Sequence, residues 1–172
     1  LSESAKETSA LAESANPQDE TYLVPAFSGL GAPYWRNEPN AMLVGMSRTT
    51  TKNEVVKAAL DSIAYQIHDI LSLMNSHKVV NCLCVDGGPT GNPYLMQFQS
   101  DIAGIPVMVS GCEESSALGA ALLAGLQCGF YEESVMENTS RKGVYLPKMD
   151  DITKQKKVNG WNQAVSLFMN DK

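Results

Sequence analysis

Residues 79–104 read VVNCLCV, then DGGPTGN, then PYLMQFQSDIAG. The apolar first segment predicts a strand over 79–85, and the apolar spacing of the last segment predicts a helix that stops at Gly104. Between them, Gly87, Gly88 and Gly91 allow a ligand to approach the backbone closely. A strand, a glycine loop and a helix in this order place helix amides beside the carboxyl end of the strand, so we expect a nucleotide or another anion there.

Composition bounds the protein class. A chain of 172 residues forms one domain or part of a larger one, and its net charge of -6 with scattered Lys and Arg argues against binding nucleic acid or a membrane surface. No apolar run reaches the roughly 18 to 20 residues of a membrane span, and the polar N-terminus does not resemble a signal peptide. The four cysteines form no metal-binding spacing. We expect Cys82 and Cys84 to be buried thiols on one strand face, in a cytoplasmic protein.

The rest of the chain alternates strands and helices, which favours an α/β domain. Thr51 and Glu54 have the spacing of a capping box and predict the start of a long helix. The small residues of a later helix suggest close packing against a sheet, whereas the charged stretch 130–157 is typical of solvated surface. The expected elements are strands at 22–27, 41–46 and 107–109, and helices at 52–74 and 116–127, with an amphipathic segment at 161–169 that packs back on the body.

Several blocks stand in one order along the chain: VPAFSGLGAPYW at 24–35, DSIAYQ at 61–66, VDGG at 85–88 with Asn92, LMQFQSD at 95–101, Glu114, and ALGAA at 117–121. Together they resemble the C-terminal domain of the FGGY carbohydrate kinases, most closely their glycerol kinase branch. The resemblance covers the chain from about residue 22 to residue 161. It implies that residues 1–172 are the C-terminal nucleotide-binding domain of a two-domain kinase, with an incomplete ribonuclease-H-like (actin-like ATPase) α/β fold, a mixed sheet flanked by helices.

The resemblance also implies an activity: ATP-dependent phosphoryl transfer to a hydroxyl of glycerol, with ATP and Mg²⁺ as cofactors. Gly87, Gly88 and Asn92 match the family positions that line the adenine and ribose pocket. An asparagine amide offers a ligand both a donor and an acceptor. A second interpretation needs no ligand, because Asn92 before Pro93 is also a good helix N-cap. The two roles are compatible.

The family's phosphate-binding turns, substrate-binding residues and general base have no counterpart here. We therefore assign no catalytic residue and no metal ligand in this chain, and we expect the general base in a missing N-terminal domain. We therefore expect the isolated fragment to be inactive. Its expected partners are ATP or ADP, glycerol or a related polyol or sugar, and the missing domain. Surface and cap roles are favoured over catalysis for four available carboxylates, those of Asp61, Asp69, Asp101 and Glu114.

Two alternatives stay open. The substrate could be another sugar or polyol, such as xylulose, ribulose or gluconate, because the residues that select it lie mainly in the missing part. The domain could instead be a non-catalytic actin-like assembly module that associates as a homo-oligomer through the exposed strands and the loop around Trp35.

Overall fold

The computed structural model describes residues 4–112, 114–137 and 140–170. Its elements are η1 (Ala5–Glu7), α1 (Thr8–Glu13), β1 (Tyr22–Val24), β2 (Met42–Val44), α2 (Lys52–Asn75), β3 (Leu83–Val85), η2 (Gly88–Gly91), α3 (Pro93–Ala103), β4 (Val107–Ser110), α4 (Ser115–Gln127), η3 (Glu133–Glu137), β5 (Arg141–Tyr145) and α5 (Asp151–Asn170). No helix within the described ranges is long and apolar enough to cross a membrane.

Two small sheets are present. β1 and β2 pair antiparallel, with Leu23 opposite Leu43. β3 and β4 pair parallel, and β5 joins the other side of β4 antiparallel, so the second sheet is mixed. The helix α3 connects β3 to β4, which makes a β-α-β unit whose carboxyl strand ends meet at one edge of the sheet.

The two central helices begin and end where the sequence predicts. The side chain of Thr51 accepts from Asn53 N and that of Glu54 accepts from Thr51 N, which confirms the capping box of α2. Gly104 ends α3 with φ of +71°, a left-handed conformation that suits glycine.

The core lies between α2, α3, α5 and β1. The stacked rings of Tyr65 and Trp161 have centroids 5.2 Å apart, and Phe98 meets Tyr65 edge-on at 5.5 Å. All three side chains are buried, so these rings form the centre of the core. The amphipathic segment at 161–169 does pack on the body, and its helix begins ten residues earlier than expected, at Asp151.

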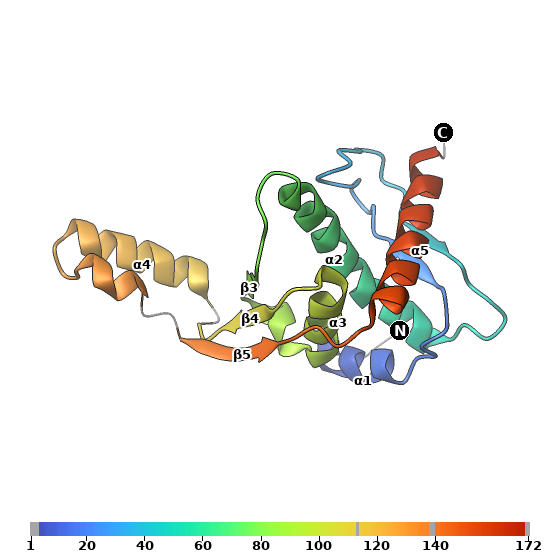
Figure 1. Ribbon diagram of the computed structural model, residues 1–172, viewed down its shortest axis with the longest axis horizontal. Coiled ribbons are helices and arrows are strands. Elements are labelled where there is room, and N and C mark those ends of the chain that lie inside the picture. Colours follow the sequence, from blue (N-terminus) through green and yellow to red (C-terminus); the bar gives the residue numbers. More distant parts are fainter. Residues whose placement is uncertain (1–3, 113, 138–139, 171–172) are drawn as a thin grey trace.

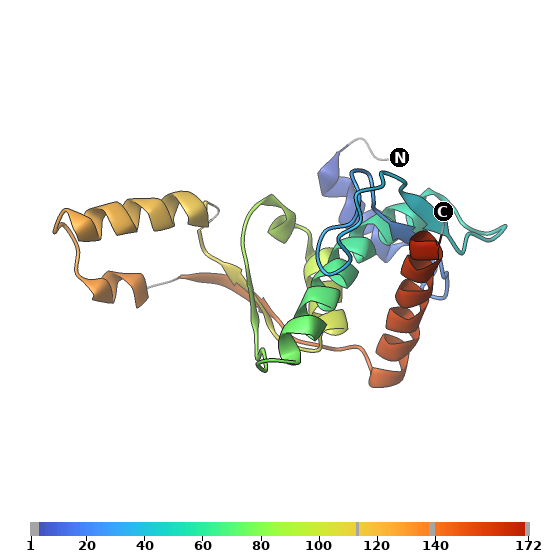
Figure 2. The same cartoon turned by 90° about the horizontal axis from the view of Figure 1, so that it is seen from above.

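Two expectations about burial are wrong, those for α4 and for the cysteines of β3. Gly125 is the one residue of α4 that is buried, and Figures 1 and 2 show α4 standing away from the body with η3 rather than lying on a sheet. The stretch 130–157 is exposed or half-buried wherever its burial is described, as expected, although part of it forms β5, which pairs with β4. Cys84 is exposed and Cys82 half-buried, because alternate residues of β3, Leu83 and Val85, face the core instead.

Candidate functional site: a glycine loop at the sheet edge

The loop that follows β3 is held by its own hydrogen bonds. Gly87 has φ of +85° and ψ of 178°, a conformation nearly restricted to glycine. Its carbonyl oxygen accepts from Thr90 N at 3.1 Å and from Thr90 Oγ1 at 2.7 Å. A Cβ added at Gly88 or Gly91 would meet no atom within 4 Å. The loop is therefore ordered internally while the space beside Gly88 and Gly91 stays open to a ligand.

Asn92 sits between this loop and α3. Its Oδ1 accepts from Leu95 N at 3.0 Å, so the predicted N-cap is confirmed, with Pro93 as the first helical residue. Its Nδ2 donates to Thr8 Oγ1 at 3.0 Å. These bonds fix the side chain, and each polar atom of the amide retains further hydrogen-bonding capacity. Contact between Asn92 and a nucleotide stays a prediction.

A cavity of about 300 Å³ adjoins the loop at the carboxyl ends of β3 and β4. Its wall combines apolar groups such as Val85 and Val109 with the polar side chains of Asp86, Ser110 and Arg141. Ligands of α/β proteins bind outside the carboxyl strand ends, so this position suits a nucleotide. Sequence reasoning missed Ser110 and Arg141. Ser110 could have been found from the sequence VSG at 109–111, where a strand runs into a loop. Arg141 lies at the cavity only because β5 pairs with β4, which the sequence did not indicate.

Metal ligands are sparse at this edge. Within the described parts of the chain, no three His, Cys, Asp or Glu side chains gather around one point. Asp86 is the carboxylate that lines the 300 Å³ cavity. Mg²⁺ is commonly bound by one or two carboxylates together with substrate phosphates. This chain could therefore supply at most one ligand, Asp86, to a Mg²⁺ ion that is bound mainly by the nucleotide phosphates.

Three of the four candidate carboxylates are structural rather than surface groups, which corrects the expectation. Asp61, 3% exposed, accepts from Lys57 Nζ at 2.5 Å and from Tyr94 OH at 2.7 Å. Its burial raises its pKa, while Lys57 and Tyr94 oppose that effect. Asp69 Oδ2 accepts from Tyr34 and Trp161, both at 2.8 Å.

The remaining two of the four carboxylates, Asp101 and Glu114, have different environments. Asp101 accepts from the backbone N–H of Lys148 at 2.6 Å and of Met149 at 3.2 Å, which attaches the segment before α5 to α3. Glu114 occupies the N-cap position of α4 without a capping hydrogen bond from its side chain. Asp61, Asp69 and Asp101 thus accept hydrogen bonds from other groups of the chain, which gives each of these three carboxylates a structural role.

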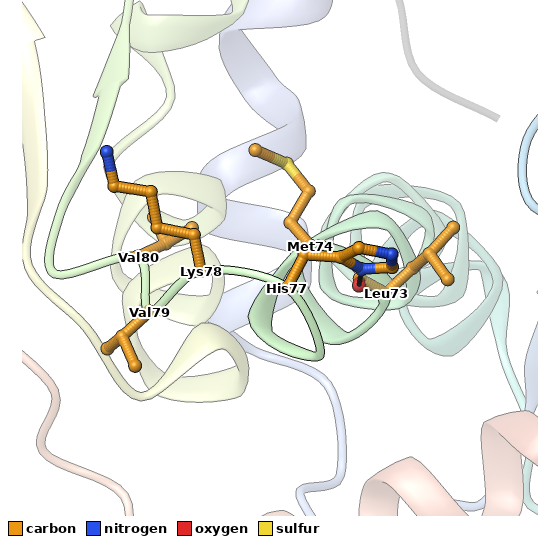
Figure 3. A pocket seen from close by; sticks show the side chains of 6 residues that line it. All are labelled: Leu73, Met74, His77, Lys78, Val79 and Val80. Atoms are coloured by element: carbon orange, nitrogen blue, oxygen red, sulfur yellow. Dashed lines mark hydrogen bonds between the residues drawn. The ribbon is translucent and has the colours of Figure 1, made fainter.

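A further cleft of about 480 Å³ lies at the end of α2. Figure 3 shows Leu73, Met74 and His77 on one side of it and the segment 78–80 on the other. Its wall is almost entirely apolar, and Val79 is 71% exposed. Without convergent polar groups, this cleft has no arrangement suited to chemistry.

Comparison with known proteins agrees with the fold and identifies the family. Residues 1–128 match the "FGGY family of carbohydrate kinases, C-terminal domain". The chain is 42% identical over 168 residues to the glycerol kinase of Lactococcus lactis subsp. lactis, covering 95% of this chain and 34% of that protein. It is 43% identical over 171 residues to the glycerol kinase of Desulforamulus reducens, covering 97% of this chain and 34% of that protein.

Solved structures give the same result. The structure of Plasmodium falciparum glycerol kinase with ADP aligns with a TM-score of 0.82 and 36% identity, over 96% of this chain and 34% of that one. Gluconate kinase from Lactobacillus acidophilus aligns with a TM-score of 0.84 at 19% identity, over 99% and 36%, which supports the fold alone. The chain thus spans about a third of the length of the relatives it matches. On this evidence it belongs to the FGGY family of carbohydrate kinases, where it corresponds to the C-terminal domain.

Proposed function

We propose that this chain supplies the adenosine side of an ATP site in an enzyme that phosphorylates a hydroxyl of glycerol. The observation that carries the proposal is the ordered Gly87–Gly88 backbone with open space beside it, at the carboxyl edge of β3 and next to a 300 Å³ cavity. A flat base can approach glycine where a side chain would block it. The relative from Plasmodium falciparum was solved with ADP, which supports the nucleotide part.

In this proposal each residue has a limited role. The backbones of Gly87 and Gly88 form the wall against which the adenosine lies, and the Asn92 amide contributes a hydrogen bond while it caps α3. Mg²⁺, bound with the nucleotide phosphates, would neutralise charge on the transferred group. The general base and most phosphate-binding groups belong to the rest of the enzyme, so the chain alone does not transfer phosphate.

The exposed apolar surface of α4 supports the proposal that this chain is part of a larger enzyme. Leu118 is 44% exposed, Leu123 60% and Phe130, just beyond the helix, 79%. A helix with this much apolar surface is normally covered by another element. In our proposal, residues 1–172 are the C-terminal nucleotide-binding domain of a two-domain cytoplasmic kinase, and α4 packs against the part of that enzyme that the relatives have in addition.

Titration of the chain with ADP by calorimetry tests the nucleotide site. Gly88→Val fills the open space and should weaken ADP binding at least tenfold without affecting folding, since Gly88 lacks a positive φ. Gly31→Val is the matched control, because Gly31 also has open space around it but lies outside the loop. Equal affinity of the two variants for ADP, or measurable glycerol phosphorylation by the chain alone, would contradict the proposal.

The substrate is tested on the enzyme with both domains. Identities of 42% and 43% to glycerol kinases favour glycerol over xylulose, ribulose and gluconate. Turnover of these four compounds should therefore be fastest with glycerol, and a higher kcat/KM for any other would reject that assignment.

An assembly module remains the second candidate. Phe27 is 72% exposed and Trp35 75%, and both lie in the segment that joins β1 to β2. Such side chains suit contact with a second copy. Light scattering that shows a tight dimer, together with no heat of ADP binding, would favour this function over the kinase.

A further inference from the structure

A second cavity adjoins the core and is separate from the cavity beside the glycine loop. It measures about 680 Å³ and lies between α1, α3 and α5. The cavities of 680 Å³ and 300 Å³ have no lining residue in common. The near-parallel rings of Tyr94 and Phe98, with centroids 6.0 Å apart, form part of its wall.

Two lysines from different helices reach this cavity. Lys57 comes from α2 and Lys157 from α5, and both line the wall. Their Nζ atoms lie 5.7 Å and 6.0 Å from the centroid of the Phe98 ring. The two ammonium groups are thus held near one aromatic side chain by separate elements of the core, which fixes their position better than a flexible surface would.

The carboxylates nearby do not neutralise both lysines. Lys57 pairs with Asp61, whose other oxygen accepts from Tyr94 OH. Two carboxylates, those of Asp101 and Glu13, line the cavity itself. Asp101 Oδ1 accepts from Gln97 Nε2 and from the backbone N–H groups of the segment 148–149, and Glu13 Oε1 accepts from Ser9 Oγ at 3.2 Å. In the described part of the chain, no carboxylate lies within 4.0 Å of Lys157 Nζ. Lys157 is therefore a half-buried cation without an ion-pair partner.

The surroundings of Lys157 disfavour its charged form, because attraction to Asp61 and Glu20 offsets only part of the effects of burial and of repulsion by neighbouring lysines. Burial, and then the neighbouring Lys57 ammonium, lower the pKa of Lys157. A bound anion would offset both effects, because opposite charge in a partly desolvated site interacts more strongly than in bulk water. The compact ammonium of lysine binds phosphate as a point charge and does not require the planar geometry that arginine offers a carboxylate.

We propose that this cavity binds a small organic phosphate, with its phosphate group between Lys57 and Lys157 and its carbon skeleton against the rings of Tyr94 and Phe98. Lys148 lines the same cavity and adds a further positive charge. The site is distinct from the adenosine site, so it provides the enzyme with a second ligand-binding position.

Nuclear magnetic resonance and calorimetry of the chain test this site with two probes, inorganic phosphate and phenyl phosphate. Phenyl phosphate should bind one to one, more tightly than inorganic phosphate, and should shift the amide resonances of Phe98 and Lys157. Lys157→Gln should weaken binding at least tenfold, the loss expected for one charged hydrogen bond. Lys157→Arg, which keeps the charge, should retain most of the affinity.

Lys156→Gln is the matched control. Lys156 is adjacent in sequence, but its side chain is 69% exposed and pairs with Glu20 at 2.7 Å. The affinity of the Lys156→Gln variant for phenyl phosphate should equal that of the unmodified chain. The proposal is overturned if neither probe binds, if both bind equally, if Lys156→Gln and Lys157→Gln lose the same affinity, or if the shifted resonances lie in residues 86–92. Lys157→Gln removes a charge that has no partner, so it should fold normally, which circular dichroism checks.

Discussion

Glu54 joins the start of α2 to the segment that follows α1. Its Oε1 accepts from Asn16 N at 2.8 Å, and its Oε2 accepts from Thr51 N at 2.7 Å and from Thr51 Oγ1 at 2.6 Å. The substitution Glu54→Gln replaces one of these acceptor oxygens by an NH₂ group that faces a donor. It should therefore destabilise both the helix start and the packing of the N-terminal segment.

The bonds from Thr51 and Asn16 hold the pKa of Glu54 at about 2, against an ordinary value of 4.5. At 1.36 kcal/mol per pH unit, this difference corresponds to about 3 kcal/mol, and screening at the helix end reduces it to about 1.5–2 kcal/mol. The pKa of Glu54 is lower in the folded chain than in the unfolded chain. The stabilisation is therefore fully present above pH 4.5 and is lost as the pH falls towards 2.

Urea unfolding followed by tryptophan fluorescence measures this effect. At pH 7, Glu54→Gln should lower the free energy of unfolding by about 1.5–2 kcal/mol, and the difference from the unmodified chain should shrink at pH 3. Glu20→Gln is the control, since Glu20 forms an exposed ion pair with Lys156 and should change stability by less than about 0.5 kcal/mol. Equal stability of the two variants at pH 7, or a loss that does not depend on pH, would refute the reasoning.

Two further predictions concern buried donors and the glycine loop. Asp69→Ala leaves Tyr34 OH and Trp161 Nε1 without their acceptor and should cost about 2–4 kcal/mol, seen as a lower Tm, while Asp69→Asn keeps an acceptor oxygen and should lose less. Gly87→Ala should cost about 1–3 kcal/mol because of its positive φ, whereas Gly88→Ala should leave the free energy of unfolding within about 0.5 kcal/mol of the unmodified chain. A similar loss at both glycines would contradict the strain at Gly87.

The loop at the centre of the proposed site could be predicted in part. Its glycines and the capping role of Asn92 follow from neighbouring residues, and the structure places them at the carboxyl end of β3 as expected. The 300 Å³ cavity beside it could not be predicted, because Arg141 reaches it from a strand more than 50 residues further along the chain. Its sequence RKGVY has little apolar alternation, and the strand exists through pairing with β4.

Elements with local determinants were set by the sequence alone. Thr51 with Glu54 starts α2, and Gly104 ends α3, because the hydrogen bonds of a helix terminus involve residues a few positions apart. Tertiary structure decided the rest. Asp61 is buried because Lys57 and Tyr94 satisfy its hydrogen-bonding groups. Most of α4 is uncovered because, of the described elements, mainly the short η3 packs on it, although its small residues suit close packing. Burial depends on what lies opposite a side chain in space, and local periodicity carries no information about that partner.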